Sequence, residues 1–124
     1  MSEVSSPACV LVVDDEESIR ATVRAALDLE GYRVLEAADG AEALRIAASE
    51  TPCAVLLDMR MPVLDGWGFA REARRRGYDF PIVVMTAAEN ARRWCDEIGG
   101  DACLPKPFDI DALFQVVEPY CSRV

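Results

Sequence analysis

Short, largely apolar runs recur five times along the chain, and they constrain its fold more than any other feature. Unbroken apolar runs of this length are typical of strands buried on both faces, as in parallel sheets. Apolar residues at helical spacing, with turn residues around them, lie between consecutive runs. The sequence therefore predicts five strand–helix units, with strands at 8–13, 32–37, 53–57, 81–85 and 102–104.

The length of the chain limits it to one domain. It has 124 residues, of which 52% are hydrophobic, enough for one buried core and too few for two full-sized ones. Strands that alternate with helices, without an internal linker, predict a single-domain, doubly wound α/β fold with helices on both faces of a parallel sheet. We expect residues 8–122 to form this domain and residues 1–7 to be a flexible N-terminus.

The charge balance bears on the partners of the chain. Twenty-two acidic residues against 13 basic ones give a net charge of -9. This balance argues against direct binding of nucleic acid or an anionic membrane by this domain, because phosphate groups are bound by basic surfaces. Cations, metal ions and basic protein surfaces are favoured. We find neither a long apolar stretch nor a basic–apolar leader that would predict a membrane span or signal peptide.

Histidine and cysteine usage narrows the chemistry further. The chain has no histidine, which excludes serine–histidine and cysteine–histidine catalysis and any phosphohistidine on this chain. It has five cysteines, an odd number, without a C-x-x-C pair. We therefore expect reduced thiols and a cytoplasmic location. The cysteines are Cys9, Cys53, Cys95, Cys103 and Cys121.

Polar residues stand where the predicted strands end, and ligands of such sheets bind at the carboxyl ends of the strands. Asp14 and Asp15 follow the first strand, and Asp58 follows the third. Neighbouring carboxylates raise one another's pKa unless a cation joins them, and oxygen ligands suit Mg²⁺. The alternative for Asp14 and Asp15 is an acidic helix N-terminus that complements the helix dipole. Asp58 after the third strand favours the metal site.

Three of these strand-ending residues have the chemistry of phosphoryl transfer. Asp58 can act as a covalent nucleophile, although a simple loop cap is the alternative. Lys106 is the only lysine in the chain, lies between two prolines after the fifth strand, and is a suitable point charge for phosphate. Thr86 ends the fourth strand and could donate its hydroxyl to a phosphoryl oxygen, although packing alone could also explain it.

Taken together, these motifs resemble the receiver domain of two-component response regulators, the CheY-like fold. The matching segments are Asp14-Asp15, Asp58-Met59-Arg60-Met61-Pro62 with Asp65-Gly66, Thr86-Ala87 and Lys106-Pro107-Phe108, within residues 8–121. The resemblance implies strand order 2-1-3-4-5, which is the order known for CheY itself.

The resemblance also implies a role for each site residue. Asp58 would accept a phosphoryl group from the phosphohistidine of a sensor histidine kinase or phosphotransfer protein. Asp15, Asp58 and the backbone carbonyl of Arg60 would bind Mg²⁺ directly, and Asp14 would act through coordinated water. Lys106 would pair with the phosphoryl oxygens and Thr86 would move toward them. The chain would then be a switch for a downstream output protein and not an enzyme.

Three positions and one stretch of the chain depart from the pattern of the family or vary within it. Cys103 stands where receivers usually carry a switch aromatic, so we expect the output to be transmitted by loop and helix displacement. The stretch 86–99 is about two residues shorter than is usual, which predicts a short or displaced fourth helix. Within it, we expect Trp94 to pack inward, with an exposed binding anchor as the alternative. Arg60 could shield the phosphoryl group, and Ala88 offers no acid to orient water, which predicts slow self-dephosphorylation.

The sequence also allows other functions for the chain. An aspartate-nucleophile phosphatase or phosphotransferase acting on small molecules is the main alternative, although such enzymes usually have a second acid where this chain has Arg60. A flavodoxin-like cofactor binder would need a phosphate-binding loop where this chain has four acids at 14–17. The sequence leaves open whether the chain is a stand-alone regulator, which we favour because it begins with Met1, or an excised receiver. A homodimer is one alternative for its oligomeric state.

Overall fold

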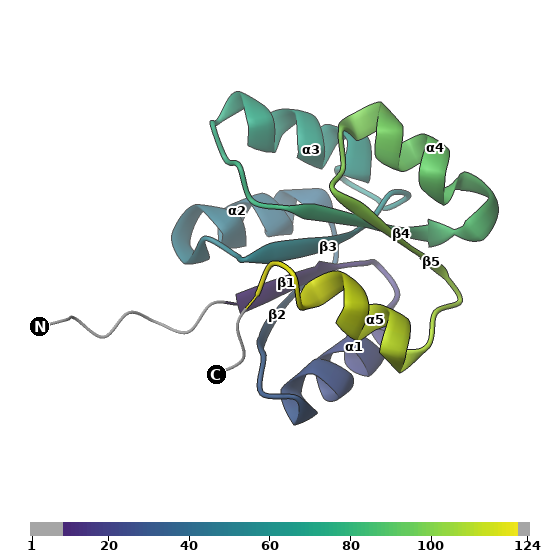
Figure 1. Ribbon diagram of the computed structural model, residues 1–124. Coiled ribbons are helices and arrows are strands. Elements are labelled where there is room, and N and C mark those ends of the chain that lie inside the picture. The colour runs from purple at the N-terminus through teal and green to yellow at the C-terminus, as the bar shows by residue number, and fades with distance from the viewer. Residues whose placement is uncertain (1–8, 122–124) are drawn as a thin grey trace, which may run out of the picture.

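A computed structural model describes residues 9–121, which form one layered α/β unit (Figure 1). Strands and helices alternate along the chain, as the apolar runs predict. The predicted segment 1–7 lies outside the described residues. The elements are β1 (Cys9–Val13), α1 (Glu17–Leu29), β2 (Arg33–Ala37), α2 (Gly40–Glu50), β3 (Ala54–Asp58), α3 (Gly66–Arg75), β4 (Ile82–Ala87), α4 (Ala88–Ile98), β5 (Ala102–Lys106) and α5 (Ile110–Val117).

The sheet has the order β2-β1-β3-β4-β5 and all four strand pairs are parallel, which confirms the predicted fold class and strand order. The register aligns the ends of the strands: Val13 pairs with Leu57, Asp58 with Met85, and Ala87 with Lys106. Because every strand runs in the same direction, the residues that follow them gather at one end. We call this the carboxyl end of the sheet, and the opposite one the amino end.

Helices cover both faces of the sheet (Figure 1). Successive side chains of a strand point to opposite faces, so Leu11 and Val13 of β1 belong to one core cluster and Val10 and Val12 to the other. The first cluster packs under α2, α3 and α4, and the second under α1 and α5. A strand buried on both faces needs an unbroken apolar sequence, which explains the runs in the chain.

Aspartates begin three of the helices. The side chains of Asp39, Asp65 and Asp109 accept hydrogen bonds from backbone N–H groups three residues on, at the starts of α2, α3 and α5. The helix α4 instead begins directly after β4 without a side-chain cap. Its 11 residues equal the length of α2, so of the predicted short or displaced fourth helix the short length is wrong. The helix follows β4 without a connecting loop, which accounts for the shorter stretch. None of the helices at 9–121 is long and apolar enough to cross a membrane.

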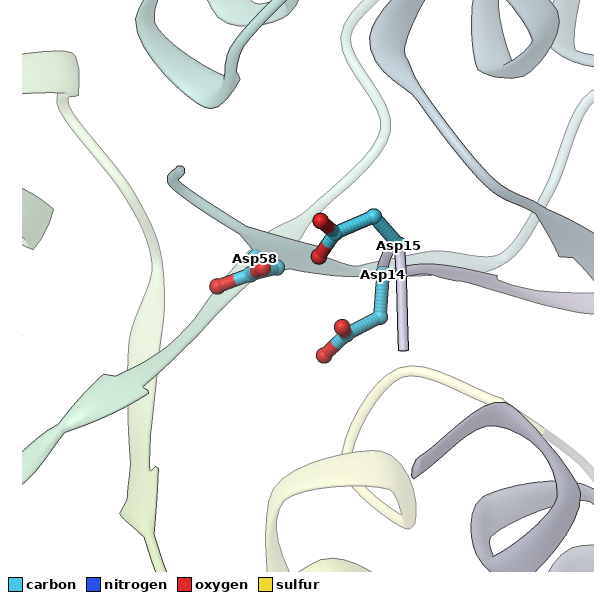
Figure 2. A group of neighbouring side chains, drawn as sticks. All are labelled: Asp14, Asp15 and Asp58. Atoms are coloured by element: carbon cyan, nitrogen blue, oxygen red, sulfur yellow. The ribbon is translucent and has the colours of Figure 1, made fainter. Parts of the chain in front are cut away.

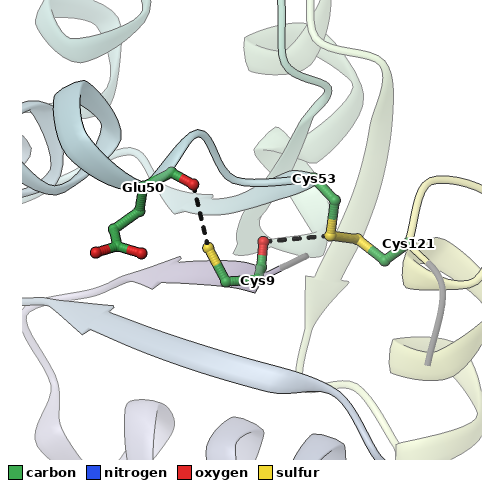
Figure 3. The surroundings of a disulfide bond; sticks show 4 residues. All are labelled: Cys9, Glu50, Cys53 and Cys121. Atoms are coloured by element: carbon green, nitrogen blue, oxygen red, sulfur yellow. Dashed lines mark hydrogen bonds between the residues drawn. A yellow bond between two sulfur atoms is a disulfide. The ribbon is translucent and has the colours of Figure 1, made fainter. Parts of the chain in front are cut away.

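The prediction that all five cysteines are reduced differs from the structure. Cys53, just before β3, and Cys121, just after α5, form a disulfide, so the expectation that all five thiols are reduced is wrong (Figure 3). The two residues are 68 positions apart, and only the fold brings their Cα atoms to 5.4 Å at the amino end of the sheet. Cys9, Cys95 and Cys103 are free thiols.

Candidate functional site

Three carboxylates meet at the carboxyl end of the sheet. Asp14 and Asp15 follow β1, and Asp58 ends β3, the strand next to it (Figure 2). One oxygen atom from each of the three side chains lies within 4.8 Å of the other two. Asp14 is fully buried and Asp58 is nearly so, whereas Asp15 is exposed. The arrangement is therefore an acidic pocket open to solvent on the side of Asp15.

Asp14 is buried, and each of its oxygen atoms has a defined partner. One carboxylate oxygen accepts a hydrogen bond from the backbone N–H of Glu16 at 2.9 Å, and the other accepts one from Nζ of Lys106 at 2.7 Å. The backbone carbonyl of Asp14 accepts a hydrogen bond from Arg20. These hydrogen bonds replace the hydration that the side chain loses on burial.

Lys106 is the cation of this pocket. It ends β5, and its Nζ lies 2.7 Å from Asp14 and 3.7 Å from an oxygen of Asp58. Glu16, which the sequence does not single out as a site residue, is 3.9 Å away. Burial lowers the pKa of Lys106, but the hydrogen bond to Asp14 and the charges of Asp58, Asp14 and Glu16 outweigh it and raise the pKa above its usual value. The ammonium is therefore held protonated between the acids. The Lys106–Pro107 peptide bond that follows is cis.

The pKa of Asp58 is strongly raised by its surroundings in this pocket. Burial, followed by the negative charge of Asp14, raises the pKa of Asp58 to about 6. The Lys106 ammonium and the backbone N–H of Met59, which donates to Asp58 at 2.9 Å, act in the opposite direction. Two carboxylates with only one close ammonium leave an excess of negative charge. A further cation in the pocket would relieve it.

Thr86 and Cys103 lie on the strands beside Asp58. Thr86 is buried in β4, one position after Met85, the register partner of Asp58. Cys103 of β5 pairs with Val84 and packs, half-buried, against the core cluster under α4. The predicted site residues Asp14, Asp15, Asp58, Thr86 and Lys106 therefore all gather at the carboxyl end of the sheet.

The side chain of Arg60 takes part in a different contact. Its guanidinium carbon lies 5.1 Å from the ring centroid of Trp94, which is a cation–π distance. Trp94 is buried, as predicted, and meets the ring of Trp67 edge-on at 5.0 Å. Trp67 donates its indole N–H to Glu97. Sequence reasoning missed this aromatic group, because residues 60, 67 and 94 share no periodic signal.

The loop between Asp58 and α3 is closely packed. The backbone N–H of Gly66 donates to the carbonyl of Met59 at 2.9 Å. A Cβ at Gly66 would lie 2.6 Å from Met59 Sδ and 2.8 Å from its Cα, so only glycine fits this approach. Val63, in the same loop, has φ of 68° and is 82% exposed. A β-branched residue in the left-handed region is strained.

Comparisons with known proteins identify the class. Residues 10–118 match the family model described as the response regulator receiver domain. The chain is 43% identical over 109 residues to the response regulator MprA of Mycolicibacterium vanbaalenii, and 42% over 106 residues to that of Mycobacterium ulcerans. These stretches cover 86% and 84% of the chain, but only 47% and 46% of the relatives, so the chain spans about half their length.

Solved structures agree with this class. The chemotaxis protein CheY4 of Vibrio cholerae has a TM-score of 0.82 and 32% identity, over 93% of this chain and 99% of that one. The receiver domain of NtrX from Brucella abortus has a TM-score of 0.82 and 31% identity, over 90% and 96%. The chain belongs to the response regulator receiver domain family, whose members are the signalling switches of two-component systems.

Proposed function

We propose that Asp58 is the phosphoacceptor of this receiver and takes its phosphoryl group from the phosphohistidine of a sensor histidine kinase or phosphotransfer protein. The observation that carries the proposal is the position of Asp58 in an acidic pocket 3.7 Å from the only lysine of the chain. Its side chain is nearly buried but keeps 11% of its surface exposed, and its negative environment favours reaction with an electrophile once a cation offsets the charge.

The residues of the pocket fit Mg²⁺. Oxygen ligands without histidine or cysteine suit this ion, and three carboxylates offer oxygens within 4.8 Å of one another. Asp15, Asp58 and the backbone carbonyl of Arg60 would hold the ion directly, and Asp14 would do so through coordinated water. The bound ion would supply positive charge that offsets the acids and the phosphoryl oxygens.

In the transfer step, a carboxylate oxygen of Asp58 attacks the phosphorus atom. The new P–O bond forms as the P–N bond to the donor imidazole breaks, and the imidazole keeps the electron pair of that bond. Lys106 would turn its ammonium from Asp58 to a phosphoryl oxygen, and the hydroxyl of Thr86 would donate to another. Hydrolysis of the acyl phosphate reverses the modification. We expect it to be slow, because Ala88 offers no acid to orient water.

The output is a population shift between two arrangements of the elements that carry Thr86 and Lys106, which are β4, β5 and the helices that follow them. Cys103 has no ring to rotate, so displacement of loops and helices would carry the signal to a downstream output protein.

We propose that the domain acts in the cytoplasm. A negatively charged domain would not bind nucleic acid or an anionic membrane directly. A homodimer is a further proposal.

The alternative function, an aspartate-nucleophile phosphatase or phosphotransferase, is not favoured. Such an enzyme needs a second acid beside the nucleophile. Arg60 stands two residues after Asp58, and its guanidinium lies over Trp94.

Incubation with acetyl phosphate and Mg²⁺ tests the proposal. We expect a mass increase of about 80 Da, one phosphoryl group, that depends on the metal and is lost in Asp58→Asn. Asp79→Asn, which removes an exposed acid far from the pocket, is the matched control and should be modified normally. An adduct that persists in Asp58→Asn would contradict the proposal.

A further inference from the structure

The disulfide joins two parts of the chain that also meet at the site, which are β3 and the segment from Lys106 to Cys121. Cys53 directly precedes β3, which ends in Asp58, and Cys121 follows α5, the helix after Lys106. At the carboxyl end of the sheet, Lys106 and Asp58 form an ion pair at 3.7 Å. Strand β3 and the segment from Lys106 to Cys121 are thus linked at both ends, by charge at one and by a covalent bond at the other.

Cys53 is the more accessible of the two sulfur-bearing residues. It is half-buried and lines a surface pocket of about 360 Å³ at the amino end of the sheet. Thr51, Pro52, Tyr78 and Phe80 also line this pocket. Cys121 is only 7% exposed. A thiolate from solvent would therefore reach the bond from the side of Cys53.

The surroundings also accommodate the reduced form. The backbone carbonyl oxygen of Cys9 lies 3.2 Å from Sγ of Cys53 (Figure 3). The disulfide sulfur carries no proton, but a Cys53 thiol would find this oxygen as a ready acceptor. Cys121, for its part, packs in the apolar cluster under α1 and α5, where a neutral thiol is well tolerated. Neither sulfur would become an unsatisfied buried group on reduction.

The third nearby cysteine does not compete for the bond. The Cys9 side chain points away from the disulfide, and its Sγ lies 4.0 Å from the carbonyl oxygen of Glu50 (Figure 3). Cys9 is 1% exposed, and burial raises the pKa of its thiol. A protonated thiol is a poor nucleophile in exchange, so the pairing of Cys53 with Cys121 is preserved.

We propose that Cys53–Cys121 is a reversible thiol–disulfide exchange site for a low-molecular-weight thiol. A thiolate attacks Sγ of Cys53, the S–S bond breaks, and Cys121 leaves as a thiolate that takes a proton from water. A second thiolate then attacks the outer sulfur of the mixed disulfide and releases Cys53. In sum, the protein disulfide and two small thiols give the protein dithiol and one small disulfide.

The exchange changes how α5 is held. In the dithiol, the end of the helix loses its covalent link to β3, while Leu113 and Val117 still pack in the core. The chain would remain folded, with the helix freer to move. The inference that the bond opens in the cell rests on the cytoplasmic location under the proposed function, because disulfides there are usually transient.

A redox titration of the whole chain tests the proposal and does not depend on phosphorylation. The folded protein is equilibrated with reduced and oxidised glutathione at varied ratios, quenched in acid, unfolded and alkylated. We expect three alkylated cysteines in oxidising mixtures and all five in reducing ones, with the same ratio reached from either direction. Five at every ratio, or three even in excess reduced glutathione, would overturn the proposal.

Variants separate this site from other thiols. Cys53→Ser should abolish the two-thiol change, and Cys121→Ser should do the same if the first variant does not fold. Cys103→Ser is the control and should retain the change. Hydrogen exchange adds a local readout: on reduction we expect amides of α5 to exchange about 10-fold faster, because local opening follows local stability. Equal rates in both forms would overturn the inferred effect on α5.

Discussion

The two ends of the sheet are built from different interactions. At the carboxyl end, Asp14, Asp58 and Lys106 bring charges into a nearly buried pocket. At the amino end, the Cys53–Cys121 disulfide closes a 68-residue separation, beside an open pocket. The first arrangement places like charges close together at a cost in stability, whereas the second stabilises the fold by restricting the unfolded chain.

This difference indicates how a small domain can hold a destabilising site. The strands pass through both ends, so β3 carries Cys53 just before its first residue and Asp58 as its last. Strain at a functional site is tolerated where the surrounding structure holds it in place. The comparison predicts that changes at the amino end alter stability alone, whereas changes at the carboxyl end alter stability and chemistry together.

Loss of the disulfide should have the largest effect on stability. A cross-link between residues so far apart in sequence is expected to contribute about 4 kcal/mol through the entropy of the unfolded chain. Cys121→Ser should therefore lower the free energy of unfolding in urea by roughly that amount. Phosphorylation by acetyl phosphate should continue. A variant with unchanged stability would remove the contrast between the two ends.

Loss of the Lys106 ammonium should have the next largest effect on stability. Lys106→Gln leaves the Asp14 and Asp58 carboxylates without their cation, at a cost of about 3 kcal/mol at pH 8. The pKa of Lys106 is raised by folding, so its contribution is present at pH 8 and is lost only as the pH rises through that raised value. The cost should shrink at pH 3, because Asp58, whose pKa is raised to about 6, is protonated there. Urea unfolding at both pH values measures it. An equal cost at both would contradict the electrostatic account.

Removal of the Asp58 carboxylate should raise the free energy of unfolding, whereas loss of the Lys106 ammonium lowers it. The pKa of Asp58 rises from 3.8 to about 6 on folding, so the native state binds the proton more tightly. Stability is therefore lost as the pH rises between these two values, and the loss is complete above them. Asp58→Asn should raise the free energy of unfolding by at most about 3 kcal/mol at pH 8 and by little at pH 3. Urea unfolding without Mg²⁺ gives the result. A gain that is the same at both pH values would show that charge is not its source.

The sequence predicts the two ends unequally well. The apolar runs predict the strands because burial on both faces requires them, and the residues after each run predict the pocket because parallel strands end together. The disulfide was not predicted: Cys53 and Cys121 pair only through the path of the whole fold, and the thiols themselves have no spacing that indicates it. The contact of Arg60 with Trp94 was not predicted either, because it also depends on the fold, through the packing of α4.

The smallest effects should come from one residue in the left-handed region at each end. Val63 has φ of 68° in the loop after Asp58, and Thr51 has φ of 49° at the end of α2, close to Cys53. Both are β-branched, and asparagine tolerates this conformation better. Val63→Asn and Thr51→Asn should each raise the free energy of unfolding by about 1 kcal/mol.

The two variants, Val63→Asn and Thr51→Asn, should differ in the rate at which acetyl phosphate phosphorylates them. The loop of Val63 connects Asp58 to α3, so relief of its strain should change the rate of phosphorylation by acetyl phosphate. Thr51 lies at the opposite end of β3, and its replacement should leave that rate as it is. Unfolding in urea and the rate of phosphoryl incorporation, measured on the same protein samples, give both results. If Thr51→Asn altered the rate as much as Val63→Asn, the two ends of the sheet would be coupled through β3, and the separation of stability from chemistry would not hold.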